Sequence, residues 1–227
     1  VEARDTEDFE NVTYRMRLRR ARATLNGHIS SRLSYRLRYE FTQGTGNSEE
    51  ELLNGSLLDA FVKYEISKNF SVLAGQKSLY IDNKGMKIRA DDQAFIERSR
   101  VVSSFASIRD IGVFFEGRHH ITGNHKIKTF VEIVSGDGAN NFSNNLGGLK
   151  YGGRVQYYPN GYFRSGGEFR EPDNYREQQP KIAFGFYGNY NDGVSSRRGR
   201  KSGTFLYYDA ERKELLPDYY QLGGDVL

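Results

Sequence analysis

The chain has 227 residues, of which 37% are hydrophobic and 14% are aromatic, and its formal net charge is +4. The absence of Cys excludes a disulfide framework and most thiolate metal sites. No run of eighteen apolar residues occurs, which excludes a transmembrane helix. Because the net charge is modest, the distribution of charge over the faces of the predicted elements carries the information.

The stretch 11–41 predicts two β-strands in which apolar and basic side chains alternate. Successive side chains of a strand point to opposite faces, so one face of this ribbon is apolar and the other is basic. The apolar positions change parity after Leu18, which predicts a β-bulge near Arg19 and Arg20. The basic face of the two strands consists of Arg15, Arg17, Arg19, Arg36 and Arg38.

Seven further strands are predicted before the last segment, in which another begins at Tyr219. Alternation places Lys63, Lys77 and Arg154 on the faces opposite the apolar residues of their strands. Short and long connections alternate, as in an up-and-down meander. The predicted strands cover residues 58–66, 70–77, 110–118, 127–133, 151–157, 162–169 and 181–190.

The segment 82–107 breaks the alternation and is too long for an ordinary connection. Long ordered connections are usually functional. In a barrel this segment could fold inward and narrow the pore, and it carries the basic residues Lys84, Lys87, Arg89, Arg98 and Arg100.

Two architectures fit strands of this kind. A soluble sandwich would bury the apolar face, whereas a transmembrane barrel would turn it to lipid and line a water-filled lumen with the arginines. A mean hydropathy of −0.71 together with many Tyr and Gly residues favours the barrel. About nine complete strands and the start of another predict that 1–227 is one barrel domain, the amino-terminal portion of a longer barrel, because single-chain barrels have even strand numbers.

Four motifs give the chain a resemblance to the phosphate-selective porin O and P family of outer-membrane channels. They are Arg-Arg-Ala-Arg at 19–22, Gly75-Gln76 followed by Lys77, Glu97-Arg98-Ser99 and Arg109-Asp110-Ile111-Gly112. The resemblance extends over nearly the whole chain. It implies an all-β, antiparallel up-and-down transmembrane β-barrel of sixteen strands in the bacterial outer membrane, of which this chain covers about the first nine or ten. It also implies a homotrimer.

The function expected from these features is diffusion of small anions, phosphate or related oxyanions, along a lumen lined by arginine and lysine. Guanidinium keeps its charge and binds phosphate in a bidentate fork. The candidate anion pathway consists of Arg15, Arg17, Arg19, Arg36, Arg38, Lys63, Lys77 and Arg154. The resemblance further implies that Lys84, Lys87 and Arg89 are candidates for the constriction loop. The alternative is a porin-type barrel that acts as a scaffold in a larger outer-membrane complex, with its lumen plugged and its loops 43–57 and 191–217 binding partner subunits.

The sequence does not favour a catalytic site or a metal site. The carboxylates of the inward faces, Asp59 and Glu116 among them, are explained by ion pairing, so no catalytic residue and no enzyme activity is expected. His119, His120 and His125 lie in a predicted turn without a suitably spaced carboxylate, so no metal site is expected there. No cofactor and no nucleic-acid partner is expected either. Membrane lipid and small anions are the expected partners. Tyrosines, Tyr80 among them, fit girdles at the membrane interfaces, and packing of several of them between subunits is the alternative.

Overall fold

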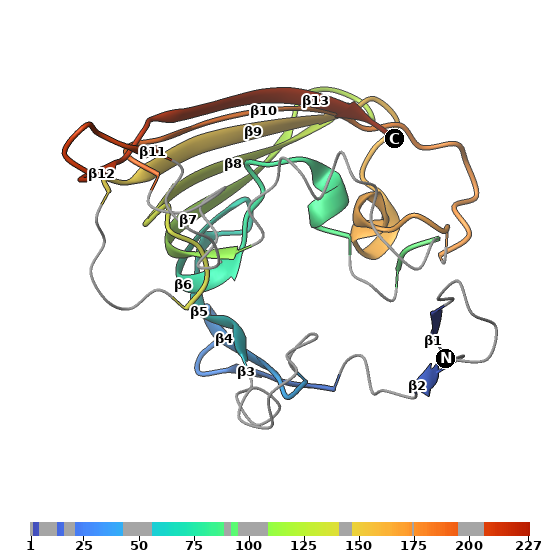
Figure 1. The fold of residues 1–227 in the computed structure, drawn as a ribbon. Helices are drawn as coiled ribbons and strands as arrows, with labels where there is room; N and C mark the ends of the chain where they lie inside the picture. The colour runs from blue at the N-terminus through green and yellow to red at the C-terminus, as the bar shows by residue number, and fades with distance from the viewer. Residues whose placement is uncertain are drawn as a thin grey trace.

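The structure, a computed structural model, describes residues 2–4, 13–15, 21–42, 56–88, 92–94, 109–140, 147–173, 175–194 and 207–227. Its main element is an antiparallel sheet of nine strands in the order β13-β10-β9-β8-β7-β6-β5-β4-β3, which curves into an arc (Figure 1). No helix among the described residues is long and apolar enough to cross a membrane.

The strands of this sheet are, in chain order, β3 (Arg22–His28), β4 (Leu33–Glu40), β5 (Ser56–Ser67), β6 (Phe70–Ser78), β7 (Arg109–His120), β8 (Lys126–Val134), β9 (Lys150–Tyr158), β10 (Phe184–Asn191) and β13 (Tyr219–Val226). Every strand from β3 to β10 pairs with its neighbours along the chain. The predicted class, an all-β antiparallel up-and-down meander, is therefore confirmed.

Shorter elements complete the described fold. Two pairs of strands form separate two-stranded sheets, β1 (Glu2–Arg4) with β2 (Thr13–Arg15) and β11 (Tyr207–Tyr208) with β12 (Glu214–Leu215). Two 3-10 helices, η2 (Lys84–Met86) and η3 (Arg164–Phe169), belong to the long connections that follow β6 and β9. In Figure 1 both helices, green and orange, lie on the concave side of the arc.

The two faces of the sheet differ in composition as the alternation predicts. On β7, Val113 is 38% exposed, whereas the next residue, Phe114, is fully buried. The outer face carries exposed apolar residues such as Val131 and Val155, which suits contact with lipid. The inner face is covered by the segment after β6, where Ile81 is fully buried against the core.

The predicted strand at 162–169 is wrong, because the structure forms η3 there. Ser165 and Gly166 have φ values of 47° and 75°, in the left-handed region that is incompatible with a strand. The chain from β9 to β10 is therefore one long connection, 159–183, at the end of the sheet where the other connections are short turns.

The amino-terminal part also differs from the expectation of one strand from Val12 to Leu25. Residues 13–15 pair with β1 in a sheet of their own, and the main sheet begins with β3. The predicted bulge at 19–20 lies outside the described residues. Within the described sheet, the register shifts instead between Arg38 and Tyr39 on β4 and between Glu65 and Ser67 on β5.

Candidate functional site

An open pocket of about 490 Å³ lies on the inner face of the sheet, between β3–β7 and the segment that follows β6. Four of its lining residues are basic and two are acidic, a formal excess of two positive charges. A pocket with such an excess and protein walls on several sides concentrates small anions. Its charged lining residues are Arg36, Lys63, Lys77, Lys87, Asp59 and Glu116.

Glu116 holds the two lysines of the pocket wall. It accepts from Lys77 Nζ at 2.8 Å and from Lys63 Nζ at 3.4 Å. Lys77 is only 5% exposed, and its ammonium lies 4.8 Å from the centroid of the Phe114 ring and 4.7 Å from that of Tyr80. These two lysines are therefore fixed in the wall, with part of their charge offset by one carboxylate.

Arg36 enters the pocket from β4 with its guanidinium exposed. Its Nε donates to Asn26 Oδ1 at 2.8 Å, from the paired position on β3, and its charged group lies 5.8 Å from the Phe61 ring centroid. Among the described residues, no carboxylate pairs with Arg36. The amide and the ring orient the side chain without neutralising it, so its remaining N–H groups are available to a ligand.

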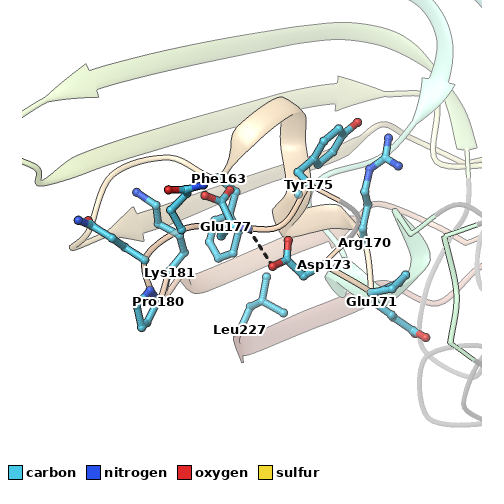
Figure 2. A pocket seen from close by; sticks show the side chains of 13 residues that line it. Phe163, Arg170, Glu171, Asp173, Tyr175, Glu177, Pro180, Lys181 and Leu227 are labelled. Atoms are coloured by element: carbon cyan, nitrogen blue, oxygen red, sulfur yellow. Dashed lines mark hydrogen bonds between the residues drawn. The ribbon is translucent and has the colours of Figure 1, made fainter.

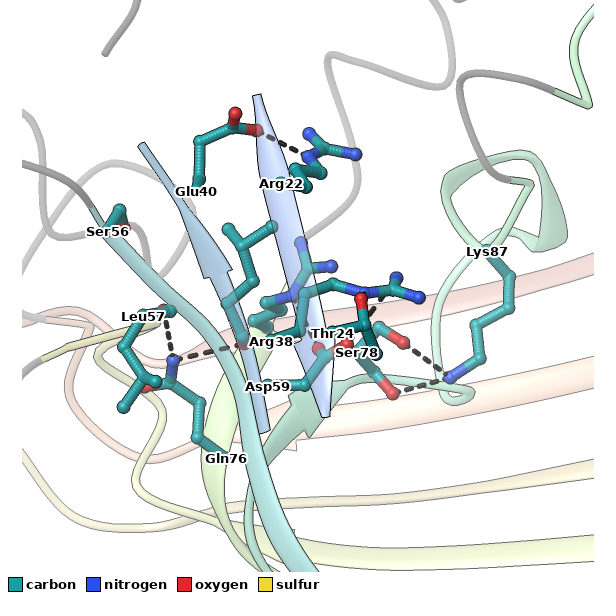
Figure 3. Close-up of polar contacts among 12 residues, drawn as sticks. Arg22, Thr24, Arg38, Glu40, Ser56, Leu57, Asp59, Gln76, Ser78 and Lys87 are labelled. Atoms are coloured by element: carbon teal, nitrogen blue, oxygen red, sulfur yellow. Dashed lines mark hydrogen bonds and ion pairs between the residues drawn. The ribbon is translucent and has the colours of Figure 1, made fainter. Parts of the chain in front are cut away.

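Lys87 closes the pocket from the opposite side. Its Nζ donates to the carbonyl oxygen of Ser78 at 2.5 Å and to Ser78 Oγ at 2.9 Å, as Figure 3 shows, and lies 3.3 Å from the Tyr80 ring centroid. Burial and the nearby Lys77 ammonium hold the pKa of Lys87 well below its ordinary value. The described part of the chain gives this ammonium no carboxylate within ion-pair distance.

A short turn sets the position of Lys87. Asn83 caps the amino-terminal end of η2, and its side-chain oxygen accepts from the backbone N–H of Gly85 at 2.8 Å. The N–H of Lys87 then donates to the carbonyl of Lys84 at 2.8 Å. A capped turn of this kind fixes the direction in which the chain leaves it, so the predicted constriction residue Lys87 faces the predicted wall residues Arg36 and Lys77.

Arg38 lies on the same inner wall but does not line the pocket. Its Nε donates to Thr24 Oγ1 at 3.0 Å, and its guanidinium is 3.6 Å from Asp59, as seen in Figure 3. Asp59 also accepts from Arg109 Nε at 2.8 Å. The ion pairing that the sequence predicts for this carboxylate is present in the structure.

Arg154 is held in a different part of the inner wall. It is 2% exposed, donates to Asp225 Oδ1 at 2.6 Å and to the carbonyl of Asp82 at 3.3 Å, and does not reach the pocket. Lys84 does not line the pocket either. Its buried Nζ lacks a hydrogen-bond partner among the described residues, and burial lowers its pKa.

The remaining candidates are placed as follows. Arg15 ends β2 and belongs to the β1–β2 sheet rather than to the wall of the pocket. Arg17, Arg19 and Arg89 lie outside the described residues.

Tyr80 is a site residue that the sequence assigned to an outer girdle, and this assignment is wrong. The ring stacks on Phe130 of the inner face at a centroid distance of 4.0 Å, between Lys77 and Lys87. The position of Tyr80 in the sequence could have predicted its inward placement, because Tyr80 comes just after β6, in the long segment where the alternation has stopped.

The histidines make local hydrogen bonds, such as His119 Nε2 with Thr129 Oγ1 at 3.0 Å and His125 Nδ1 with the Tyr157 hydroxyl at 2.6 Å. Within the described ranges, no group of three His, Cys, Asp or Glu residues is placed to hold a metal ion.

Comparison with known proteins gives one finding. A family model described as phosphate-selective porin O and P matches residues 2–184, well over half of the chain. Searches among curated proteins and among solved structures each returned no match. The family match confirms the resemblance that the four sequence motifs indicated, and it includes every basic residue of the pocket.

Proposed function

The chain belongs to the phosphate-selective porin O and P family, and from this premise we propose that it passes small anions, phosphate-like oxyanions in particular, along the basic inner wall of its barrel. Members of this family are outer-membrane porins, which are channels rather than enzymes. We propose that the chain prefers anions, that the anions pass along its pocket, and that it carries out no covalent chemistry.

One observation carries the proposal: Arg36 and Lys87 face a common pocket of about 490 Å³ and, within the described residues, neither is paired with a carboxylate. Flux through a pore requires attraction strong enough to admit an ion and weak enough to release it. Two such cations, backed by the partly compensated Lys63 and Lys77, provide several moderate sites rather than one tight site.

The cellular setting proposed here follows from the family. The chain would lie in the bacterial outer membrane, with lipid against its outer apolar face and two further copies completing a homotrimer. Residues 1–227 would form one domain of the barrel.

Reconstitution in a planar bilayer under a salt gradient tests the proposal. We expect full-length protein to give an anion-selective reversal potential, and Arg36→Ala to move it toward zero. Arg32→Ala is the matched control, because Arg32 lies exposed in the β3–β4 turn and makes no described side-chain contact. A cation-selective pore, or equal shifts in both variants, would contradict the proposal. Addition of inorganic phosphate should reduce the chloride current if phosphate shares the pocket.

The structure also gives an observation in favour of the scaffold alternative. The connections after β6 and β9 both lie on the concave side of the sheet, where they bury inner-face residues such as Phe130 and Arg154 (Figure 1). If they closed the lumen, the folded protein would insert into the bilayer and conduct no current, and co-purification would then identify its partner subunits.

A further inference from the structure

The connection 159–183 is unlike the other described connections at its end of the sheet. The turns after β3, β5 and β7 cover only residues 29–32, 68–69 and 121–125. Hairpin strands need loops of about two to five residues. A much longer connection between neighbouring strands loses conformational entropy when it is ordered, so contacts must offset that cost.

Those contacts begin with an anchor on the inner wall. Glu168, in η3, is fully buried. It forms an ion pair with Lys128 of β8 and accepts from the hydroxyl of Tyr158 of β9 at 3.0 Å. A buried carboxylate with a cation and a hydroxyl as partners is expensive to dislodge, so η3 is fixed against β8 and β9.

The residues after η3 then meet the long connection that follows β6. Arg170 donates to Asp92 Oδ1 at 2.7 Å, the N–H of Glu171 donates to the Asp92 carbonyl at 3.0 Å, and the N–H of Ala94 donates to Glu171 Oε2 at 2.5 Å. We name this set of contacts the latch. Figure 2 shows Arg170 and Glu171, the first two residues after η3, among the residues that line a pocket of about 370 Å³.

The two connections reach the latch from opposite ends of the sheet. The strands alternate in direction, and β6 and β9 are separated by two strands. The last residue of β6 and the last residue of β9 therefore lie at opposite ends of the strands of the sheet. The segment after Ser78 therefore reaches the concave side from the end of the sheet that carries the long connections. The segment after Tyr158 reaches it from the end that carries the short turns.

The latch is also connected to the candidate anion site. The ring of Phe169, the last residue of η3, lies 5.4 Å from the ring of Tyr80. Tyr80 in turn stacks on Phe130 and lies under the ammonium of Lys87. Removal of η3 would take away one side of the aromatic stack that supports Lys87.

We propose that residues 164–171 are a second constriction element, which enters the lumen from the short-turn end, latches onto residues 92–94 and positions Tyr80 and Lys87. Its residues are positioning residues: they act on passing ions through the width of the lumen and through Lys87. The proposal deepens the proposed channel function, because it assigns the pore size to two connections rather than to one.

A disulfide trap tests the latch without any need for conduction. Asp92 and Glu171 are joined by a backbone hydrogen bond, a separation compatible with disulfide geometry, and the chain has no Cys of its own. In the full-length folded protein, Asp92→Cys with Glu171→Cys should form an intramolecular disulfide on mild oxidation, seen as a mobility shift that a reductant reverses. Folded protein that stays fully reduced under these conditions would overturn the proposal.

Single-channel recording tests its effect on the pore. Arg170→Ala should raise the conductance and the open-channel noise, and the charge swap of Arg170→Asp with Asp92→Arg should bring both back toward wild type. Arg176→Ala is the control, since it removes the same charge from an exposed side chain of the same connection without a described contact to the loop. If Arg170→Ala behaves like Arg176→Ala, the second constriction is wrong.

The outcomes separate this proposal from the channel itself. Wild-type protein that folds and forms the disulfide but carries no current contradicts the channel function and leaves the latch standing. Anion-selective current with no disulfide and no conductance change supports the channel and rejects the latch.

Discussion

The inner wall has two parts that carry the same kinds of charged residue in different surroundings. On β4–β7, Arg36 faces an open pocket and is oriented by an amide and an aromatic ring. On β8–β13, Arg154 is buried under the connection after β6 and held by Asp225 and a backbone carbonyl. Both arginines satisfy the same sequence pattern, so the pattern identifies the wall but does not tell which cations meet the solute.

The difference lies in what covers each part. Lys128 and Lys150 of the β8–β13 part are paired with Glu168 and Asp82, and both carboxylates come from the inward-folded connections. Charges that are buried in this way are costly to leave without their partners. We therefore expect the β8–β13 part to govern stability and the β4–β7 part to govern transport. Three experiments test this division, and a further one tests whether the outer face contacts lipid.

Removal of the Arg154 side chain should have the largest effect on stability. Arg154→Met leaves Asp225 without its described partner, and breaking a buried pair costs about 3–5 kcal/mol in free energy of unfolding. Arg36→Met, the matched change on the open part, should cost less than about 1 kcal/mol because the side chain is exposed. Urea unfolding of the two variants in lipid vesicles measures both values. Equal losses would break the comparison.

An arginine on the outer face should have the next largest effect. Val155 lies on β9, next to Arg154 but on the opposite face, and is 47% exposed. If this face contacts lipid, Val155→Arg should lower the free energy of unfolding by about 2–4 kcal/mol. Ile121→Arg, in the turn after β7, serves as the control and should cost about 0–1 kcal/mol. A tolerated Val155→Arg would indicate that the outer face lies in water or against protein.

Arg38 and Arg36 should differ in their effect on selectivity although they are two residues apart on β4. Arg38 is held by Asp59 and Thr24 and does not line the pocket. Arg38→Met should therefore shift the reversal potential less than Arg36→Met does under the same salt gradient. A larger shift for Arg38→Met would move the anion pathway away from the described pocket.

The pH dependence of selectivity should give the smallest effect. The pKa of Lys87 is held below its ordinary value by burial and by Lys77. As the pH rises through this lowered value, Lys87 loses its positive charge, and anion selectivity should fall at a pH below about 10.4, where ordinary lysines titrate. Lys87→Met should start at the lower selectivity and lack this step. A step that persists in Lys87→Met would assign it to another group.

Much of the sheet was predictable because each strand shows its own pattern. The alternation in 33–41, 58–66 and 110–118 gives both the strand and its inward face, and the structure confirms β4, β5 and β7 there. The predicted wall residues Arg36, Lys63 and Lys77 and the predicted loop residue Lys87 line one pocket in the structure, and their role in an anion pathway stays a prediction.

The features that could not be predicted depend on distant parts of the chain. The residues 162–169 have aromatic residues at both ends, yet Ser165 and Gly166 between them adopt the left-handed conformation, and the buried pair of Glu168 with Lys128 stabilises the turn. The burial of Arg154 depends on a carbonyl at Asp82 and on Asp225, 72 and 71 residues away. A local sequence pattern cannot predict contacts between residues that lie so far apart in the chain.

These separations also order the assembly of the barrel. Hairpins of the meander can form as soon as two neighbouring strands exist, whereas Asn189 bonds the carbonyl of Ile81 across 108 residues and Arg170 reaches Asp92 across 78. Contacts at such distance form late, because the intervening chain must first be in place. The docking of Ile81 and Asp82 can therefore be completed only after β10 has joined the sheet. The nascent wall would thus pass through a stage wider than the finished channel.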